Sequence, residues 1–522
     1  MPLDVLVIGA GPAGITAAHE LARRAGGEVR VRVMEASDSV GGISRTATHN
    51  GNRMDMGGHR FFSKERRVCD WWEGVMPMQG APALDDLLLG RDCILADGGP
   101  DPQACERVML SRERVSRIYY DRRFFDYPVS LNVRTLRTMG MATTAHVGAS
   151  YLAAKARPLP EDNLENFYVN RFGRCLYSMF FEGYTKKLWG RHPSQISADW
   201  GAQRVRGLSV SAVLADMAHK LVGRKDASNT QTSLIERFSY PKYGPGQLWE
   251  AAAHDAAEAG ARIEFGERAV HVSCDADGRV GGVTFERHDG SRHELPCDVL
   301  LSSMPLKDLV GCMDGVDAQT ASIAAGLPYR DFVTVGVLVD RLALENRTGR
   351  ATLGGIVPDD WIYVQDGGVR MGRIQVFNNW SPYMVADPER TVWLGLEYFC
   401  DEGDGLWRMD DDARVDACVG ELLRMGVIDA GTRVLDTHVE RVRKAYPAYF
   451  DTYSRMGELR RWLDAHPNLF CIGRNGQHRY NNMDHSMATA FEAVRCIRSG
   501  SEDKTPIWSV NTDKSYHEEK DA

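Results

Sequence analysis

Apolar and polar positions over the first 35 residues follow the pattern of a strand, a turn and a helix. The segment "DVLVIGAG" is an apolar run that ends in glycines, "AGITAAHELARR" spaces its apolar residues as a helix does, and "VRVRVME" alternates. Apolar residues that recur every three or four positions indicate a helix, and alternation indicates a strand. The pattern therefore predicts a strand, a helix and a second strand over 4–34.

In later segments of the chain the spacing of apolar residues changes between helical and alternating patterns. Helical spacing dominates residues 131–223, and the part from 163 to 190 is the most aromatic. From 260 to 305 the residues alternate, with turn signals at DADG and HDG before the apolar run "DVLLSSM". Residues 332–400 alternate again, and "NLFCIG" predicts a last strand at 468–473. We therefore expect a helical insertion, a return to the first sheet, and a second sheet.

Composition narrows the class of protein. The chain has 522 residues and a formal net charge of -8, so no general attraction to nucleic acid is expected. Its 11 cysteines include no CxxC pair, which favours reduced thiols and no metal site. No apolar run approaches the roughly 20 residues of a membrane span, and the first residues lack the charged flank of a signal peptide. We therefore expect a cytoplasmic protein without a membrane span.

A glycine motif follows the first predicted strand. Gly9, Gly11 and Gly14 have the GxGxxG spacing, in which missing β-carbons permit a tight turn, the approach of a pyrophosphate, and close packing of helix on strand. Glu35 ends the second strand, 21 residues past Gly14, where a carboxylate accepts a hydrogen bond from a ribose hydroxyl. The spacing and its context predict a dinucleotide site.

The residues after Glu35 bear on which dinucleotide binds. The stretch "EASDSVGGISRT" adds Gly41, Gly42 and Arg45. This arrangement resembles the amine-oxidase-like flavoproteins, in which the glycine pair lets the backbone reach the diphosphate and ribityl chain of FAD. The resemblance favours FAD, and the alternative is that the glycine pair is only a turn.

The predicted fold class is α/β, with a discontinuous Rossmann-like FAD-binding domain, a helical insertion and a second, mostly antiparallel sheet domain. The expected divisions are 1–95, 240–315 and 429–500 for the three parts of the FAD-binding domain, 129–235 for a helical insertion that covers the substrate, 320–428 for a β-sheet substrate domain, and 501–522 for a loosely packed polar tail.

Four further stretches point to one family. They are "MGGHRFFSKERRVCDWW" (56–72), "FFDYPVSLN" (124–132), which contains Pro128, "FFEGYTKKLWG" (180–190) and "GRNGQHRYNNMDHS" (473–486). Together they resemble UDP-galactopyranose mutase and its nucleotide-sugar relatives, within the FAD superfamily of amine oxidases and protoporphyrinogen oxidases. The resemblance runs through most of the chain in islands, and the third stretch is the most diagnostic.

The resemblance implies a role for each matching residue. The implied cofactor-binding residues are Gly9, Gly11, Gly14, Glu35, Gly41, Gly42, Arg45, Gly58, His59, Val270, Gly473, Asn482 and Met483. The implied substrate-binding residues are Trp189, Arg204, Arg373, Tyr446, Arg474 and Tyr480, and the implied catalytic residues are Arg204, Arg474, Tyr184, Trp189 and Tyr480. Trp189 would form a wall over the flavin, and Arg204 would contact the sugar diphosphate.

Departures from the family pattern concern the nucleotide and the sugar. Asn482 replaces a usual aspartate, His478 replaces a tyrosine, and Phe238 stands where the family often has a phosphate-binding tyrosine. The turn after the last strand leads into a predicted helix N-terminus, whose free N–H groups suit flavin oxygens, while Arg474 and Tyr480 suit a diphosphate. The alternative is that Arg474 and Arg479 cap carboxylates and the tyrosines pack in the core.

Local charge fits an anionic ligand. Residues 171–206 contain seven Lys or Arg, at 171, 174, 186, 187, 191, 204 and 206, against Glu182 and Asp199, a balance of +5. Solvated helix faces would produce the same excess. The aromatic residues of "FYVNRF" and "LYSMFF" have helical spacing and are expected in the core.

The resemblance implies a ring contraction between pyranose and furanose forms of a UDP- or GDP-hexose. Reduced FAD would attack the anomeric carbon through N5 and expel the nucleoside diphosphate, and the sugar would reclose through a different hydroxyl before recapturing it. Such chemistry needs no serine or cysteine nucleophile, but it needs cations that stabilise the leaving group. The implied partners are the nucleotide sugar, a reductant such as NAD(P)H, and a second copy of the chain in a homo-oligomer.

Two other functions share these motifs. An FAD-dependent oxidase, dehydrogenase or desaturase of the amine-oxidase or protoporphyrinogen-oxidase type would carry the same glycine motifs and the strand "DVLLSSMP". A binding protein for nucleotide sugars would keep the fold without the chemistry. Net oxidation distinguishes the oxidase, and failure to retain flavin would indicate the binding protein.

Overall fold

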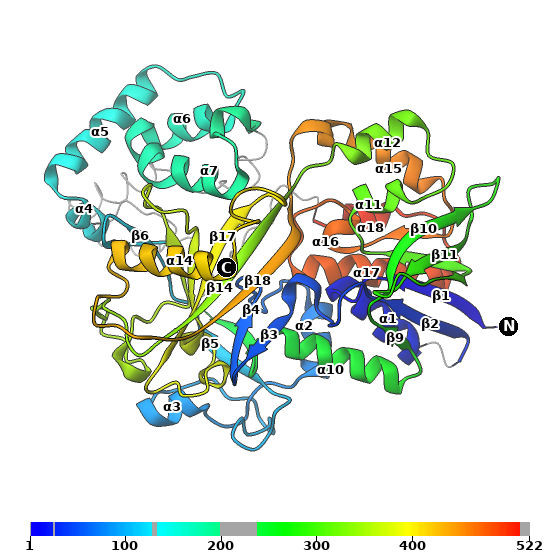
Figure 1. Cartoon of the computed structure of the whole chain (residues 1–522), viewed down its shortest axis with the longest axis horizontal. Coiled ribbons are helices and arrows are strands. Elements are labelled where there is room, and N and C mark those ends of the chain that lie inside the picture. The colour runs from blue at the N-terminus through cyan, green and yellow to red at the C-terminus, as the bar shows by residue number, and fades with distance from the viewer. Residues whose placement is uncertain (1, 25–26, 128–132, 199–236, 512–522) are drawn as a thin grey trace, which may run out of the picture.

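The computed structural model describes residues 2–24, 27–127, 133–198 and 237–511 (Figure 1). Arg204 and Pro128 therefore lie outside the described residues. The fold is α/β, with a parallel sheet in a Rossmann-like arrangement, a second sheet that is mostly antiparallel, and a set of helices inserted at the far end of that second sheet. The predicted fold class is confirmed.

The first sheet is parallel and has five strands in the order β19-β13-β1-β2-β9. Their bounds are Leu3–Ile8 (β1), Val29–Met34 (β2), Arg262–Glu264 (β9), Val299–Ser302 (β13) and Leu469–Cys471 (β19). Together with helix α1 (Pro12–Arg24), strands β1 and β2 form the unit predicted for residues 4–34. The central strand comes first in the chain, and an edge strand comes last.

Successive residues of these strands pack on opposite faces of the sheet, as expected from strand geometry. Val5 and Val7 pack beneath a layer of helices, and Leu6 and Ile8 pack against a three-stranded antiparallel sheet and three more helices. The helix layer contains α1, α2 (Arg66–Val75), α10 (Pro245–Glu258) and α17 (Met483–Ser499). The other layer contains β10 (Arg268–Cys274), β11 (Val280–Glu286), β12 (Arg292–Pro296), α11 (Leu306–Gly311), α12 (Ala318–Ala325) and α15 (Met456–Asp464).

The second sheet has seven strands in the order β18-β14-β17-β16-β15-β6-β7. Their bounds are Ser116–Tyr120 (β6), Arg123–Asp126 (β7), Tyr329–Val339 (β14), Trp361–Val364 (β15), Arg373–Val376 (β16), Val392–Cys400 (β17) and Val434–Pro447 (β18). Neighbouring strands are antiparallel except β15 and β6. Helix α14 (Asp411–Met425) packs on one face of this sheet (Figure 1).

The second sheet draws strands from outside the range 320–428. β18 lies in the range 429–500, expected as FAD-binding, but it pairs with β14 along most of its length. β6 and β7 precede the helical insertion and extend the sheet beyond β15. Alternation in the sequence identifies a strand but not its neighbour. Only the pairing of the strands in the structure therefore shows which sheet β6, β7 and β18 belong to.

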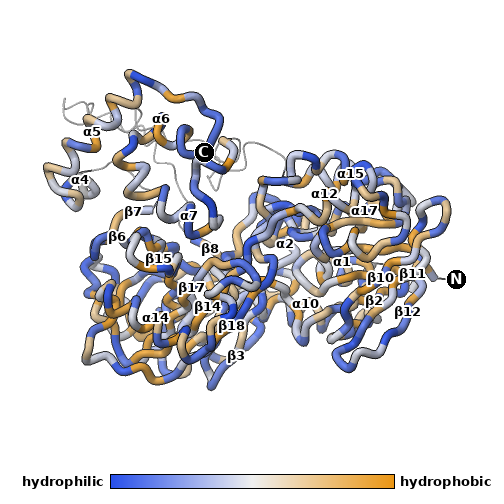
Figure 2. The backbone as a smooth tube through the Cα atoms, turned by 45° about the horizontal axis from the view of Figure 1, so that its top comes forward, coloured by the Kyte–Doolittle hydropathy of each residue, from blue (hydrophilic) through white to orange (hydrophobic). Residues whose placement is uncertain are grey.

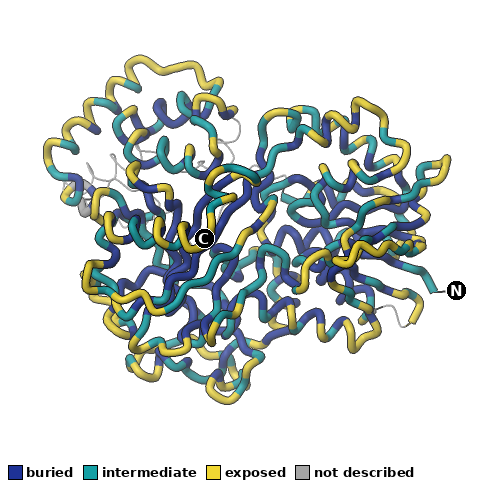
Figure 3. The backbone as a smooth tube through the Cα atoms, in the orientation of Figure 1, coloured by how far each residue is buried: buried dark blue, intermediate teal, exposed yellow. Residues whose placement is uncertain are grey.

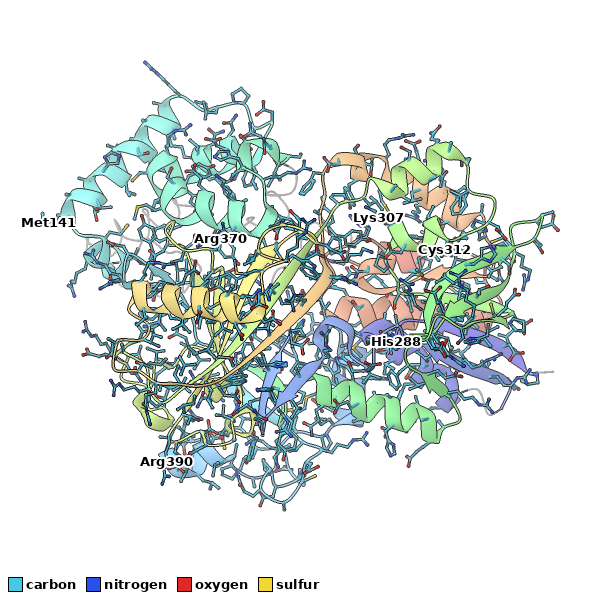
Figure 4. The ribbon with its side chains drawn as sticks, viewed as in Figure 1. Met141, His288, Lys307, Cys312, Arg370 and Arg390 are labelled. Carbon is cyan, nitrogen blue, oxygen red and sulfur yellow. The ribbon has the colours of Figure 1, made fainter. Side chains whose placement is uncertain are left out.

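Together with β4 (Asn52–Asp55) and β8 (Arg237–Pro241), the inserted helices contribute to the core on the other face of the second sheet. They are α4 (Val133–Met139), α5 (Met141–Ala156), α6 (Leu164–Tyr177), a π-helical turn η2 (Ser178–Glu182), α7 (Gly183–Trp189) and a 3-10 turn η3 (Pro193–Gln195). The connection from α5 to α6 is hydrophilic along most of its length (Figure 2), and α5 is exposed over most of its surface (Figure 3). Met141 marks its outer end (Figure 4).

Short elements complete the described chain. They are the strand pairs β3 (Thr46–His49) with β4 (Asn52–Asp55) and β5 (Met109–Glu113) with β8 (Arg237–Pro241), the helices α3 (Leu84–Leu89), α13 (Phe377–Trp380), α16 (Gly473–Gly476) and α18 (Thr505–Ser509), and the 3-10 turns η1 (Gly42–Ser44), η4 (Leu353–Gly355), η5 (Pro382–Met384) and η6 (Asp451–Arg455). Across the part of the chain that is described, no helix is both long and apolar enough to cross a membrane.

The described part of the segment after Gly500, residues 501–511, differs from the loosely packed tail that its polarity predicts. It forms α18, in which Ile507 and Trp508 are 1% and 4% exposed. The Trp508 indole N–H donates to Asp464 Oδ1 at 2.8 Å. Two apolar residues in a polar stretch are enough to fix it to the core, because each buries an entire side chain.

Candidate active site

A cavity of about 1860 Å³ lies where the carboxyl ends of the parallel strands face the seven-stranded sheet and the inserted helices. Its walls include the turns after β1, β2 and β13, helix α7, and residues of β16 and β18. It reaches α11, near which Lys307 and Cys312 lie (Figure 4). Open α/β sheets bind their ligands outside the carboxyl ends of the strands, so the cavity is where a dinucleotide is expected.

Most residues singled out from the sequence line this cavity. The expected cofactor-binding residues on its wall are Gly9, Gly11, Glu35, Gly42, Arg45, Gly58, His59, Val270, Gly473, Asn482 and Met483, and the expected substrate-binding or catalytic residues are Tyr184, Trp189, Arg373, Tyr446, Arg474 and Tyr480. Gly14 and Gly41 lie behind the wall. Among the described residues, the cavity thus collects side chains from the first turn, the insertion, the second sheet and the turn after β19.

Each of the three glycines of the first turn is needed for a different physical reason. Gly9 has φ 95°, and a β-carbon there would collide with Ser303 Oγ. A β-carbon on Gly14 would overlap the carbonyl oxygen of Gly9, so this glycine permits the packing of α1 on β1. A β-carbon on Gly11 would meet nothing closer than Gly42 Cα at 3.9 Å. The protein itself leaves room at Gly11, as a pyrophosphate-binding turn requires.

We therefore expect Gly11→Ala to weaken FAD binding without lowering the stability of the apoprotein. Overpacking a tight contact costs about 1–3 kcal/mol, which corresponds to roughly fivefold to 150-fold in the FAD dissociation constant. Flavin fluorescence titration of apoprotein measures the constant, and thermal unfolding of apoprotein measures the stability. Gly14→Ala is the matched control, because its methyl group must lower the unfolding temperature even without cofactor. Equal FAD affinity of Gly11→Ala and wild type would contradict the assignment.

Glu35 is held at the turn by three hydrogen bonds. Its Oε2 accepts from Ala10 N at 2.6 Å, and its Oε1 accepts from Ser37 N at 2.9 Å and from Ser37 Oγ at 2.8 Å. The carboxylate is thereby fixed at the end of β2 on the cavity wall, where a ribose hydroxyl is expected.

Two further backbone features shape the cofactor half of the cavity. Gly41 and Gly42 have φ of 97° and 54°, so both adopt conformations that favour glycine. The register of β10 and β11 shifts between Ala269 and His271, which places Val270 in a β-bulge on the cavity wall. Bulges of this kind commonly redirect the chain next to a site.

Gly58 and His59 lie between the two halves of the cavity. A β-carbon on Gly58 would come within 2.6 Å of the Trp361 ring, so the glycine permits this indole to pack on the backbone. The His59 Nδ1 lies 2.9 Å from the Gly57 carbonyl oxygen. A carbonyl only accepts, so Nδ1 carries the proton and Nε2 is an acceptor. Burial, with a smaller contribution from the Arg474 and Arg373 guanidinium groups, lowers the pKa of His59 to about 4.

The pKa of His59 predicts a neutral ring at physiological pH. Because the folded protein holds this proton more weakly than the unfolded chain does, stability falls as the pH decreases from about 6.5 towards 4. Histidine-labelled NMR spectra, with His59→Gln to assign the resonance, should show no titration of this ring above pH 5. A titration midpoint near pH 6.5 would mean that the His59 ring is not buried in the cavity wall.

Trp189 is positioned by the end of α7. Gly190 follows it with φ 66°, and the buried Arg330 on β14 donates from Nε to Leu188 O at 3.1 Å. This guanidinium satisfies a carbonyl that the helix end leaves open. Trp189 is 3% exposed and packs edge-on against Phe450, with ring centroids 6.4 Å apart. The predicted wall residue thus lies on the cavity surface between the insertion and the loop after β18.

Arg474 is held by backbone carbonyls. Its Nε donates to Ala445 O at 2.8 Å and its Nη1 donates to Asn481 O at 2.9 Å. The guanidinium lies over the Tyr480 ring, 4.0 Å from its centroid. Within the described part of the chain no carboxylate pairs with Arg474, so the alternative of a carboxylate cap is wrong for this residue. Its charge remains available to a ligand.

Arg373 forms the centre of a cluster of polar groups. Its Nε donates to Tyr184 OH at 2.6 Å, and its Nη1 donates to Tyr446 OH at 3.1 Å and to Glu397 Oε2 at 3.0 Å. Burial raises the pKa of both tyrosines, so both hydroxyls stay protonated. Because each hydroxyl accepts from Arg373, it keeps its own proton to donate. Tyr446 also stacks on Tyr480, with centroids 5.6 Å apart.

Glu397 was not predicted from the sequence, although it left a signal there. It is the one acid in "VWLGLEYFC", a strand whose residues are all buried. A buried carboxylate requires a partner, and Arg373 in "GRIQVF" lies directly opposite it across β16 and β17. Trp361 and Tyr363 were missed as well; they stack on each other and line the cavity.

The described Lys and Arg residues of the positively charged stretch 171–206 do not line the cavity. Arg171 and Arg174 pair with Glu161 and Glu165, Arg191 pairs with Asp451, and Lys187 donates to three carbonyls. None of these cations, nor Lys186, lines the cavity. For these five residues local charge gives no support for an anion site, because none lines the cavity and four of them are held by carboxylates or backbone carbonyls elsewhere. Arg174 and Lys186 are exposed, as the alternative of solvated helix faces expects.

Aromatic residues of the insertion do pack in the core, as predicted. Phe167, Phe172 and Tyr177 are buried together, and Tyr168 and Phe180 are buried and also reach the cavity. Phe238 is buried against Trp380 and lies away from the cavity wall. No group of three or more metal-ligating side chains is placed to hold a metal within the described ranges.

Comparison with known proteins supports the fold. Residues 7–74 match the family model of the NAD(P)-binding Rossmann-like domain. A crystal structure of reduced UDP-galactopyranose mutase superposes with a TM-score of 0.76 at 20% identity, over 99% of this chain and 99% of that one. The chain has the fold of UDP-galactopyranose mutase. The resemblance drawn from the motifs is thereby confirmed as a resemblance of fold.

Oxidases share this fold more distantly. A putative protoporphyrinogen oxidase from Exiguobacterium sp. 255-15 has a TM-score of 0.65 at 14% identity, over 96% of this chain and all of that one (100%). A triple mutant of putrescine oxidase, made to redesign cofactor binding, has a TM-score of 0.56 at 14% identity, over 96% of this chain and 99% of that one. At these identities the comparisons show the fold alone.

Proposed function

We propose that this protein is an FAD-dependent mutase that interconverts the pyranose and furanose forms of a UDP- or GDP-hexose. The observation that supports it is the cluster of Arg373 and Arg474 with Tyr184, Tyr446 and Tyr480 on one wall of the cavity. These residues come from α7, β16, β18 and the turn after β19, and only the fold brings them together. A cluster of guanidinium and hydroxyl donors suits a diphosphate.

The described residues fit FAD. Gly11 leaves space for a pyrophosphate at the start of α1, Glu35 is fixed at the ribose position, and Val270 lies in a bulge on the wall. The first helical residues of α17 face the cavity with Asn482 and Met483. When bound in its reduced form, the flavin would supply a nucleophilic ring nitrogen to the anomeric carbon, and no protein nucleophile is needed.

The protein's own residues would bind the leaving group and place the sugar. Arg474 keeps a full charge for the departing diphosphate, while Glu397 neutralises Arg373 and fixes its orientation. Tyr184 and Tyr446 then donate their hydroxyl protons to phosphate or sugar oxygens. Trp189 excludes water from one side of the cavity. These are positioning and electrostatic roles, which contribute most when the groups are already in place.

Arg204 is part of the proposal as the second cation at the diphosphate, on the strength of the sequence resemblance alone. A reductant such as NAD(P)H, a homo-oligomeric assembly and a cytoplasmic location complete it. The residues that depart from the family pattern at Phe238 and His478 do not line the cavity, so the proposal covers both UDP- and GDP-hexoses.

Isomerisation by reduced enzyme tests the function. Dithionite-reduced protein is incubated with UDP- and GDP-hexoses, and chromatography with mass spectrometry should reveal an isomer of unchanged mass. Oxidised protein is the control and should form none. The absence of any isomer, together with substrate-driven bleaching of the oxidised flavin, would establish the rival oxidase. Tight nucleotide-sugar binding without isomer in either state would establish a binding protein.

A further inference from the structure

The turn that carries Arg474 is held from behind by the C-terminal segment. We define the C-terminal brace as residues 504–511, which contain α18. Gln477 Nε2 donates to Ile507 O at 2.8 Å, and Arg479 Nη1 donates to Trp508 O at 2.9 Å and to Val510 O at 2.7 Å. Neither Gln477 nor Arg479 lines the cavity, so these bonds act on the reverse side of the turn.

One residue of the brace connects to Arg474 through a single intermediary. Asn511 Nδ2 donates to Asn481 Oδ1 at 2.9 Å. Asn481 is 2% exposed, and its backbone carbonyl accepts from Arg474 Nη1 at 2.9 Å. The Asn481 amide also donates to Gly473 O at 3.3 Å, across the mouth of the turn. The orientation of the guanidinium therefore depends on a carbonyl whose residue the brace holds.

The brace is itself rigidly anchored. Ile507 packs with the helix-side core of the parallel sheet, and Trp508 packs with the core on the opposite face. The two neighbouring residues thus straddle the edge strand β19. The buried Lys504 ammonium donates to carbonyls at the end of α15, among them Asp464 O at 3.3 Å. A segment fixed on both faces of a sheet can transmit its position to the turn beside it.

We propose that the C-terminal brace positions Arg474 for the diphosphate through the hydrogen bonds Asn511–Asn481–Arg474. The inference rests on the proposed function, because positioning Arg474 matters only if this residue binds the diphosphate of the substrate. Asn511 is a positioning residue: it lies outside the cavity wall and acts only through Asn481.

Binding of UDP to the FAD-loaded full-length protein tests the proposal, with GDP in a parallel series. Flavin absorbance changes report the dissociation constant for wild type, Asn511→Ala, Arg474→Lys and the double variant. Asn511→Ala should weaken nucleotide binding about fivefold, the effect of one neutral hydrogen bond, with unchanged FAD content. In the Arg474→Lys background it should have no further effect, because lysine lacks the guanidinium fork that bridges Ala445 O and Asn481 O.

The controls separate positioning from general stability. Glu502→Gln alters an exposed residue just before the brace and should leave binding unchanged. If Asn511→Ala weakens binding equally in both backgrounds, or not at all, the positioning role is overturned while the proposed function stands. If wild-type protein binds neither UDP nor GDP, the proposed function itself fails.

Discussion

Arg474→Ala is expected to lose a hundredfold or more in kcat/KM for the nucleotide sugar while FAD stays bound. Removing one preorganised donor from a developing negative charge costs about 2.7–4 kcal/mol, and Arg474 is held in place by two backbone carbonyls before any ligand arrives. Its guanidinium also covers the Tyr480 ring, so the ring loses a partner in the variant. Steady-state kinetics of the reduced enzyme and the flavin spectrum measure the two quantities.

Matched variants sharpen this experiment. Arg498→Ala removes an exposed arginine of α17 that does not line the cavity, and it should keep wild-type turnover. Arg204→Ala tests the other cation of the proposal and should also lose about a hundredfold in kcat/KM. Near-normal turnover of Arg474→Ala would remove this residue from the mechanism. Loss of FAD from the variant would instead assign it to cofactor binding.

Glu397→Gln is expected to lower the free energy of unfolding by about 3–5 kcal/mol, because it leaves the charge of Arg373 buried without a partner. Both side chains are almost inaccessible, at 0% for Glu397 and 8% for Arg373, and their nearest atoms are 3.0 Å apart. Chemical denaturation followed by tryptophan fluorescence measures the change.

A double variant separates stability from function at this pair. Arg373→Met combined with Glu397→Leu removes both charges and should recover most of the lost stability, because an apolar pair of similar volume often replaces a buried ion pair without loss. The double variant should nevertheless be inactive, since Tyr184 and Tyr446 lose the donor that orients their hydroxyls. An active double variant would show that Arg373 serves the fold and not the substrate.

Local patterns were sufficient to predict the cofactor half of the site. The turn at Gly9 and Gly11, the acid at Glu35 and the second glycine pair are contiguous motifs, and their geometry follows from missing β-carbons and one βαβ unit. The likeness of the turn at 473–486 to a known family predicts that Arg474 and Tyr480 face one ligand, and both line the cavity. In each case the information lies within one short stretch of the chain, residues 9–42 for the first motifs and 473–486 for the turn.

Non-local pairing was beyond the reach of the sequence. The alternating residues of β18 fit either sheet equally well, and only the register against β14 decides the matter. Arg373 and Glu397 are 24 residues apart, so the lone acid of a buried strand indicates that it needs a partner but not which residue that partner is. The low hydrophobic content after Gly500 predicts a loose tail, yet within the described residues 501–511 the side chains of Ile507 and Trp508 are buried in the core.

The strand order of the parallel sheet has a consequence for biosynthesis. β1 is made first and occupies the centre, but its neighbour β13 is paired by the edge strand only when residues 469–471 emerge from the ribosome. Until then the nascent chain carries an open, apolar strand edge, which is a risk for misassociation. The turn at 473–486, which completes one wall of the cavity, is translated directly afterwards. The cavity is therefore completed late in synthesis, once the apolar edge of β13 is covered.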